Sequence, residues 1–200
     1  MTPEPSDHRQ RVLAAMAATP RERHLTEAQR PYAGHDRALP LFDGQTNSQP
    51  STVANMLELL EVPEGARVLD VGAGSGWSTA ILAELVGPQG VVLGLELVPA
   101  LAAWGAENLA ATGRTWARLE VARPDVLGAP DEGPHDRILV SAMAERLPDT
   151  LVDQLAPGGI LVIPVAGRMC RVTRPTDGGP PQVEYRGHYA FVPLIEPSGA

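Results

Sequence analysis

The middle of the chain alternates between short apolar runs and helix-like segments, and this order constrains the fold more than any other feature. We expect buried strands at residues 67–72, 91–98, 115–122, 136–143 and 159–167. We expect helices at residues 75–87, 99–113 and 148–156. Strands joined through helices become parallel neighbours in one sheet. The pattern therefore predicts an α/β fold of the Rossmann-like kind, with a mostly parallel sheet and helices on both faces.

The segments on either side of this alternation complete the expected fold. Apolar positions recur at helical spacing over 8–18 and 51–61, and Ser51 is a candidate N-cap of the second helix. Residues 20–50 have no sustained periodicity, and a connection this long is either disordered or a functional lid. Their apolar side chains favour an ordered lid. We expect closing antiparallel strands at residues 169–175 and 183–195.

Composition and charge narrow the class of protein. The chain has 200 residues and a net charge of −8, and without any lysine all its positive side-chain charge comes from arginine. An acidic surface repels phosphate backbones, which disfavours a nucleic-acid partner. No apolar run approaches the ~18 residues that cross a bilayer, so no membrane partner is expected. The single cysteine, Cys170, fits a reducing compartment, and we expect a cytoplasmic protein. A single domain with an acidic surface is compatible with a monomer, and we expect a monomer.

A glycine-rich motif lies where the strand of residues 67–72 turns into the next helix. It reads Asp70-Val71-Gly72-Ala73-Gly74-Ser75-Gly76. Glycines there let the backbone turn tightly and let a ligand approach the main chain. The dinucleotide pattern G-x-G-x-x-G fails, because its third glycine would be Trp77 or Thr79. The remaining D-x-G-x-G-x-G resembles the first motif of class I S-adenosylmethionine methyltransferases.

A carboxylate at the end of the next strand supports the same interpretation. Glu96 lies where it can accept hydrogen bonds from both ribose hydroxyls of a bound nucleoside. Either feature alone is equally compatible with an ordinary turn and a solvated acid. Together they predict an S-adenosylmethionine site. Its expected residues are Asp70, Gly72, Gly74, Gly76 and Glu96. The five histidines have no metal-ligand spacing, and no metal site is expected.

The region before the motif narrows the choice of family. Residues 44–50 read GQTNSQP, and this stretch resembles the one that precedes the cofactor domain of protein-L-isoaspartate O-methyltransferases. The resemblance covers most of the chain, in order and at similar spacing. It includes PRERHL at 20–25, RPYAGHDRALPL at 30–41, residues 133–165 and FVPLI at 191–195. It implies methyl esterification of the α-carboxylate of L-isoaspartyl residues in proteins or peptides, which is a repair reaction.

The resemblance also implies roles for individual residues. Ser48 matches the serine that helps to hold the substrate carboxylate, and we take it as the catalytic residue. Thr46 and Gln49 match positions that line the same pocket. Such a carboxylate is already an anion at pH 7, so it needs alignment and hydrogen-bond donors rather than a general base. Ser141 and Ala142 lie at the end of the fourth strand, at the carboxyl edge of the sheet, where they are candidates for lining the substrate site.

Four positions depart from the family pattern. Asp125 is the candidate adenine contact, but it stands one place from the expected register, so its role stays open. His135 and His24 stand where an aromatic residue is usual, and Asn47 replaces a common isoleucine. These changes bear on the acceptor and leave the glycine motif untouched.

Two other functions remain open from the sequence. A dedicated peptide or small-molecule carboxylate would serve as acceptor for the same chemistry. A non-catalytic module would hold the cofactor without turnover. In each case the whole chain, 1–200, is expected to form a single domain. Its parts are the helix and substrate lid of 1–50, the cofactor-binding core of 51–168 and the C-terminal strands of 169–200.

Overall fold

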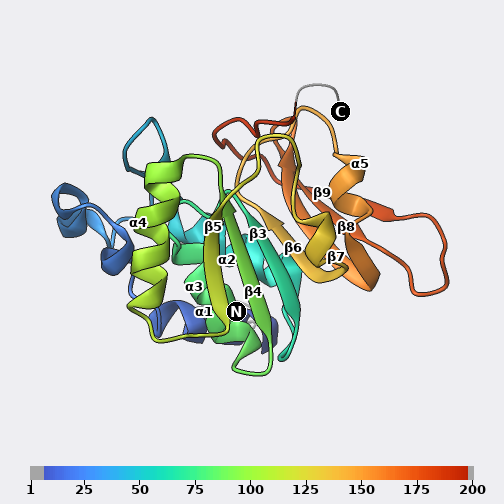
Figure 1. Cartoon of the computed structure of the whole chain (residues 1–200), viewed down its shortest axis with the longest axis horizontal. Helices are drawn as coiled ribbons and strands as arrows, with labels where there is room; N and C mark the ends of the chain where they lie inside the picture. Colours follow the sequence, from blue (N-terminus) through green and yellow to red (C-terminus); the bar gives the residue numbers. More distant parts are fainter. Residues whose placement is uncertain (1–6, 198–200) are drawn as a thin grey trace, which may run out of the picture.

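One seven-stranded sheet crosses the centre of the molecule (Figure 1). The computed structural model describes residues 7–197. The strands are β3 (Arg67–Val71), β4 (Val91–Glu96), β5 (Ala117–Val121), β6 (His135–Val140), β7 (Leu155–Val165), β8 (Arg168–Thr173) and β9 (Gln182–Arg186). Their order is β5-β4-β3-β6-β7-β8-β9. The first five are parallel to one another, and β8 and β9 pair antiparallel. The predicted Rossmann-like sheet is confirmed.

Helices cover both faces of this sheet. They are α1 (Asp7–Ala17), α2 (Pro50–Leu60), α3 (Trp77–Val86), α4 (Pro99–Ala110) and α5 (Asp149–Val152). Successive residues of a strand point to opposite faces. Val68 of β3 accordingly packs in the core beneath α1, α2 and α3, whereas Leu69 packs in the core beneath α5. Helix α4 packs on α3 and β5, where Leu109 meets Leu119.

The lid of residues 20–50 is ordered. It contains the 3-10 turns η1 (Arg21–His24) and η2 (Glu27–Tyr32) and a small ribbon of β1 (Leu39–Pro40) and β2 (Thr46–Asn47). Leu39 pairs with Asn47 in this ribbon, and both side chains are buried. The ribbon therefore fixes the residues that follow it, which lead into α2.

The predicted strand over 183–195 is wrong beyond Arg186. The chain leaves the sheet there and crosses the end of β6. The Met143 N–H donates to the Val192 carbonyl at 2.7 Å, and the Leu194 N–H donates to the Met143 carbonyl at 2.7 Å. These two bonds hold the segment of residues 190–197 (the C-terminal segment) over the carboxyl edge of the sheet.

The predicted helix over 148–156 is also shorter in the structure. Helix α5 ends at Val152, and Leu155 already belongs to β7, where it pairs with His135. Leu155 is fully buried. The strand takes over because pairing and burial of Leu155 outweigh the local preference for helix. The other predicted strands and helices of the core form, with bounds that differ by a few residues.

The predicted N-cap of α2 is wrong as well. The helix begins at Pro50, and Ser51 lies inside its first turn. The cap comes from the lid instead, since the Asp36 carboxylate accepts the Ser51 backbone N–H at 2.9 Å and the Gln49 side-chain amide at 3.0 Å. Proline suits the first helical position because its nitrogen has no hydrogen to satisfy. The lid and α2 are thus joined through one carboxylate.

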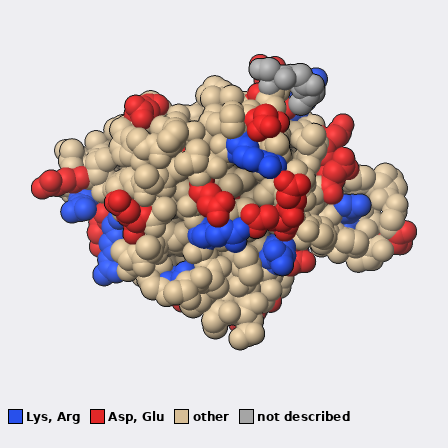
Figure 2. Space-filling model, viewed as in Figure 1, with Lys and Arg blue, Asp and Glu red and all other residues tan. Residues whose placement is uncertain are grey.

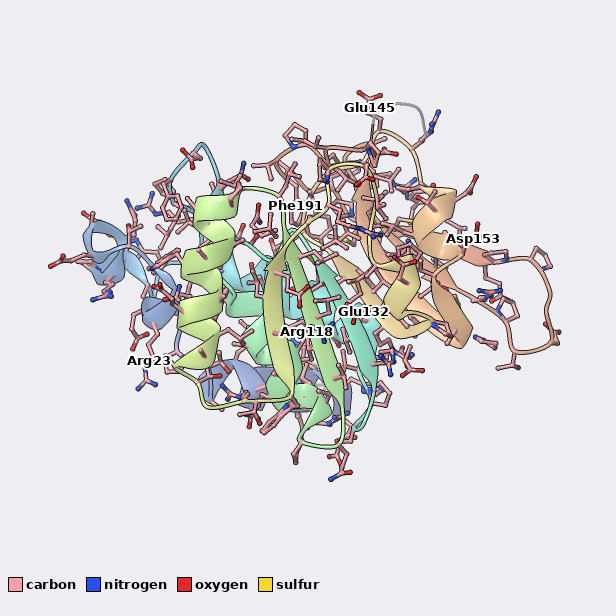
Figure 3. All side chains as sticks on the ribbon, in the orientation of Figure 1. Arg23, Arg118, Glu132, Glu145, Asp153 and Phe191 are labelled. Carbon is pink, nitrogen blue, oxygen red and sulfur yellow. The ribbon has the colours of Figure 1, made fainter. Side chains whose placement is uncertain are left out.

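Acidic and basic side chains are interspersed on the face in Figure 2. Arg118 of β5, for example, pairs with Glu132 (Figure 3). It also pairs with Glu120. Glu184 and Arg186 form a similar exposed pair on β9. Within residues 7–197, no helix combines the length and the apolar character needed to cross a membrane.

We expect Asp36→Ala to lower the midpoint of thermal unfolding at pH 7, because it removes the cap of α2. The hydrogen bond from Ser51, with that from Gln49, holds the pKa of Asp36 below its usual value. A lowered pKa stabilises the fold above the unfolded value of about 3.9, and this contribution is lost as the pH falls. The difference from wild type should therefore shrink below about pH 4. Glu27→Ala, another exposed lid carboxylate, is the control; equal effects of both variants would contradict the cap.

Candidate active site

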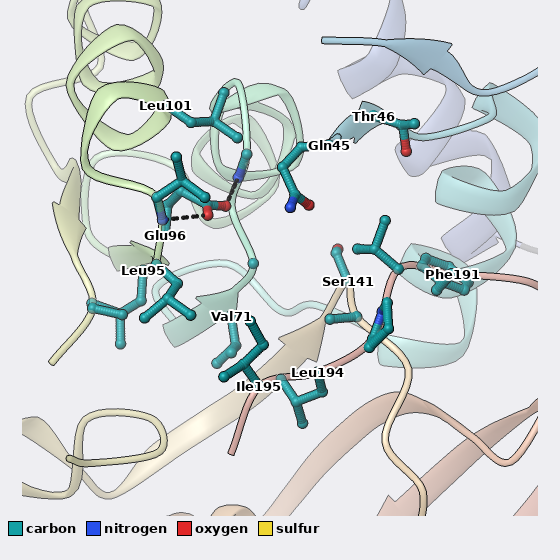
Figure 4. Close-up of a pocket in the computed structure, with 18 of the residues that line it drawn as sticks. Gln45, Thr46, Val71, Leu95, Glu96, Leu101, Ser141, Phe191, Leu194 and Ile195 are labelled. Atoms are coloured by element: carbon teal, nitrogen blue, oxygen red, sulfur yellow. Dashed lines mark hydrogen bonds between the residues drawn. The ribbon is translucent and has the colours of Figure 1, made fainter. Parts of the chain in front are cut away.

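A cavity of about 270 Å³ lies at the carboxyl edge of the sheet (Figure 4). Its walls include the lid, the glycine loop after β3, the ends of β4 and β6, the loop after β5 and the C-terminal segment. Many of the residues predicted from the sequence line this one cavity. They are Thr46, Ser48, Gln49, Gly72, Gly74, Glu96, Ser141 and Ala142. Residues more than ninety positions apart in the chain therefore face the same space.

The backbone of the glycine loop adopts a conformation that residues with side chains rarely adopt. Gly72, Gly74 and Gly76 have φ values of 78°, 54° and 79°, in the left-handed region that favours glycine. Gly74 lines the cavity, and a Cβ there would meet nothing within 4 Å. The loop thus presents bare backbone to the cavity, as a closely approaching ligand requires.

Helix α4 touches this loop through a glycine that the sequence analysis missed. A Cβ on Gly105 would lie 2.5 Å from the Gly74 carbonyl oxygen, and a Cβ on Gly76 would lie 2.6 Å from the Gly105 carbonyl oxygen. Gly76 is therefore a packing residue and does not line the cavity. The one available signal was a glycine inside an otherwise helical pattern, which often marks a close contact.

Glu96 joins the glycine loop to the next helix. Its side chain is 7% exposed, and its two oxygens accept the Gly74 N–H at 2.9 Å and the Val98 N–H at 3.0 Å (Figure 4). A carboxylate has about four acceptor sites in all. Glu96 therefore keeps acceptor capacity for two hydroxyls on the cavity side.

Asp70 does not reach the cavity. It is fully buried below the loop, where one of its oxygens accepts the Ser78 and Thr79 hydroxyls at 2.7 Å each. It thereby ties β3 to the first turn of α3. Burial raises the pKa of Asp70 to about 6, against the lowering effect of the two hydroxyls, and nearby Glu96 raises it further. Its position supports the loop rather than contacting a ligand.

Asp125 lies away from the cavity too. The Val126 N–H bonds to the Arg123 carbonyl at 3.4 Å, and the resulting turn places Asp125 on the exposed side, in a neighbouring hollow. Pro124 and Leu127 face the cavity in its place. This position gives no support to the predicted adenine contact of Asp125.

A buried arginine organises the lid, although the PRERHL stretch that contains it indicated no role for it. The Arg21 side chain donates to the Asn47 side-chain oxygen at 2.7 Å and to the Ser48 carbonyl at 2.9 Å. It also donates to the carbonyl oxygens of Ala33, His35, Arg37 and Asn47. Burial lowers the pKa of Arg21 to about 10, so the side chain stays charged at neutral pH. Its charge is satisfied largely by backbone carbonyl groups around Ser48.

Asn47 and His24, two of the residues that depart from the family pattern, both contact the glycine loop. The Asn47 amide donates to the Ser75 hydroxyl at 3.0 Å, and His24 Nδ1 lies 3.1 Å from the Ser75 carbonyl oxygen. Burial lowers the pKa of His24, which favours the neutral ring. Because a carbonyl oxygen only accepts hydrogen bonds, the contact with Ser75 assigns the proton of this ring to Nδ1. His135 is elsewhere: its Nε2 lies 3.2 Å from the Ala129 carbonyl oxygen beneath the loop after β5.

No group of three or more His, Cys, Asp or Glu side chains is placed to hold a metal ion within the described part of the chain. Cys170 is buried in β8, and burial raises the pKa of its thiol to about 11. The polar groups that line the cavity are therefore hydroxyl and amide side chains, backbone groups, Arg123 and the Glu96 carboxylate.

Comparison with known proteins identifies the family. A sequence model of the family described as Protein-L-isoaspartate(D-aspartate) O-methyltransferase (PCMT) matches residues 6–199. The chain belongs to this family. It is 42% identical over 192 residues to the Protein-L-isoaspartate O-methyltransferase of Aeropyrum pernix. The aligned region covers 94% of this chain and 74% of that relative.

Two solved structures share the PCMT fold. One protein-L-isoaspartate O-methyltransferase superimposes with a TM-score of 0.83 at 24% identity, over 94% of this chain. This chain spans only 61% of that longer one. The other is a putative enzyme of the same name from Plasmodium falciparum in complex with S-adenosyl-L-homocysteine, with a TM-score of 0.79 at 26% identity. The superimposed region covers 92% of this chain and 89% of the Plasmodium falciparum chain.

We expect Gly105→Ala to destabilise the protein. Alanine improves helix propensity by up to about 1 kcal/mol, but overpacking against backbone typically costs about 1–3 kcal/mol. Urea unfolding should therefore show a net loss. Gly34→Ala is the control, because a Cβ there meets nothing within 4 Å. A Gly105→Ala variant as stable as wild type would show that the loop yields freely.

We expect Asp70→Asn to change how stability depends on pH. A raised pKa means that the folded state favours the neutral acid, so this contribution is fully present below about pH 4 and lost as the pH rises through about 6. Each unit of raised pKa corresponds to about 1.4 kcal/mol. Wild type should lose stability relative to Asp70→Asn between these pH values. Parallel profiles in urea unfolding would contradict a buried, titrating Asp70.

Proposed function

We propose that this protein transfers the methyl group of S-adenosylmethionine to the α-carboxylate of L-isoaspartyl residues in proteins or peptides, as a repair reaction. One observation carries the proposal: Glu96 and Gly74 line the same cavity as the hydroxyl residues Thr46 and Ser48. Family membership supports the reaction, and the names of the relatives supply the acceptor.

The residues present fit this cofactor. Gly72 and Gly74 offer backbone without side chains, and Glu96 keeps acceptor capacity for the ribose hydroxyls. Leu97 and Leu127, which both line the cavity, supply apolar surface for the adenine. Once bound, the cofactor supplies a methyl group on a sulfonium, which an anionic oxygen can accept.

The acceptor side of the cavity suits a carboxylate. An α-carboxylate has a pKa of roughly 3.5, so it is an anion at pH 7 and needs no base. Ser48 and Thr46 donate hydrogen bonds that orient the carboxylate. Hydroxyl groups leave its negative charge in place, whereas an arginine would neutralise it. At Ser48, Arg21 contacts only the backbone carbonyl, and its other hydrogen bonds go to further groups of the lid. Phe191 of the C-terminal segment closes the wall and helps to exclude water.

We also propose that the chain works as a single domain and a monomer in the cytoplasm, without nucleic-acid or membrane partners. The net charge of −8 and the mixed charges on the face in Figure 2 argue against a nucleic-acid partner, because they provide no basic path for a phosphate backbone. The hydroxyl pair at Thr46 and Ser48 would also accept a dedicated peptide or a small carboxylate. The acceptor must therefore be tested directly.

The test uses mass spectrometry to measure methyl transfer from S-adenosylmethionine to an isoaspartyl peptide and to the same peptide with a normal aspartyl residue. We expect only the isoaspartyl form to gain a methyl group. Ser48→Ala should lower kcat/KM roughly ten- to hundredfold, because a hydrogen bond to a charged group contributes about 1.5–3 kcal/mol.

Retained binding of S-adenosylhomocysteine is the control for that variant. No transfer to either peptide with intact cofactor binding would point to another acceptor, which a panel of free carboxylic acids would then reveal. No transfer to any carboxylate would favour a module that only holds the cofactor.

A further inference from the structure

Ser75 connects the glycine loop to two different parts of the molecule. It is 3% exposed and lies between Gly74, which lines the cavity, and Gly76, which packs on α4. Its carbonyl accepts the Asn108 amide of α4 at 3.1 Å, and its hydroxyl accepts the Asn47 amide of the lid at 3.0 Å. Any shift of the loop therefore moves an acceptor that the lid uses.

The connection continues from Asn47 to the predicted catalytic residue. The Asn47 side-chain oxygen accepts Arg21 Nε–H at 2.7 Å, and the same guanidinium holds the Ser48 carbonyl at 2.9 Å. Arg21 and Asn47 are 6% and 4% exposed. Water cannot readily replace a broken bond at such depth, so a buried network behaves as a unit.

We propose that Asn47 and Arg21 are positioning residues, which make acceptor binding at Ser48 depend on the cofactor held by the glycine loop. The proposal rests on the function proposed above. The loop fixes Ser75, Ser75 fixes the Asn47 amide, and Arg21 fixes the Ser48 backbone together with the lid. Neither Asn47 nor Arg21 lines the cavity, so both act through their neighbours.

The chain offers matched variants for a test. Asn47→Leu has a similar size and removes both hydrogen bonds. Asn47→Asp keeps them, because one oxygen accepts from Arg21 and the other accepts from the Ser75 hydroxyl. Asn108→Ala removes a bond to the same Ser75 from the side of α4, and it leaves the lid connection in place. Ser75→Ala removes the hydroxyl that accepts the Asn47 amide, and it replaces Asn47→Leu in the test if that variant does not fold.

Two measurements on the full chain read out the connection. The first is the dissociation constant of an isoaspartyl peptide with and without saturating S-adenosylhomocysteine. The second is amide hydrogen exchange of residues 39–48 with and without S-adenosylhomocysteine, which needs no peptide. Thermal unfolding and the affinity for S-adenosylhomocysteine show whether each variant is folded and holds the ligand.

We expect S-adenosylhomocysteine to tighten peptide binding to wild type about fivefold or more, and to Asn47→Leu less than about twofold. It should slow exchange over 39–48 in wild type, in Asn47→Asp and in Asn108→Ala, and not in Asn47→Leu. An unchanged response in Asn47→Leu, or no response in wild type, would overturn the proposal. If the exchange pattern holds but no variant binds the peptide, the positioning stands and the proposed acceptor is wrong.

Discussion

The cavity depends on one contact between two stretches of backbone. Helix α4 lies so close to the glycine loop that neither Gly105 nor Gly76 has room for a Cβ. The same loop is also held at the end of β4, where Glu96 accepts the Gly74 N–H. The open side of the loop, at Gly74, then faces the cavity. A larger residue at the contact would displace the loop from the acceptor groups around it.

Local patterns made much of this arrangement predictable. Strand and helix periods are set by neighbours in the chain, so the alternation from residue 67 onwards gave the parallel sheet. The carboxyl ends of parallel strands share one edge, and this placed Gly72, Glu96 and Ser141 around one space. Ser48 came from resemblance to a family, because nothing in its immediate neighbourhood distinguishes a ligand-binding serine from a turn residue.

The errors and omissions have a common physical cause, which is contact between distant segments. Arg21 and Arg23 look alike in the sequence, but tertiary packing buries Arg21 at 6% exposure and leaves Arg23 on the surface. Asp36 caps α2 from outside the helix, whereas the local sequence pattern indicates only Ser51. The C-terminal segment reads as a strand, yet its partners lie at Met143, some fifty residues earlier.

The way the C-terminal segment is held separates shape from selectivity. Its two bonds to Met143 join main-chain atoms only, so they are indifferent to which side chains the segment carries. Phe191 and Ile195 nevertheless face the cavity, and Ile195 is 67% exposed. One wall of the site can therefore diverge freely during evolution while the scaffold that supports it stays the same.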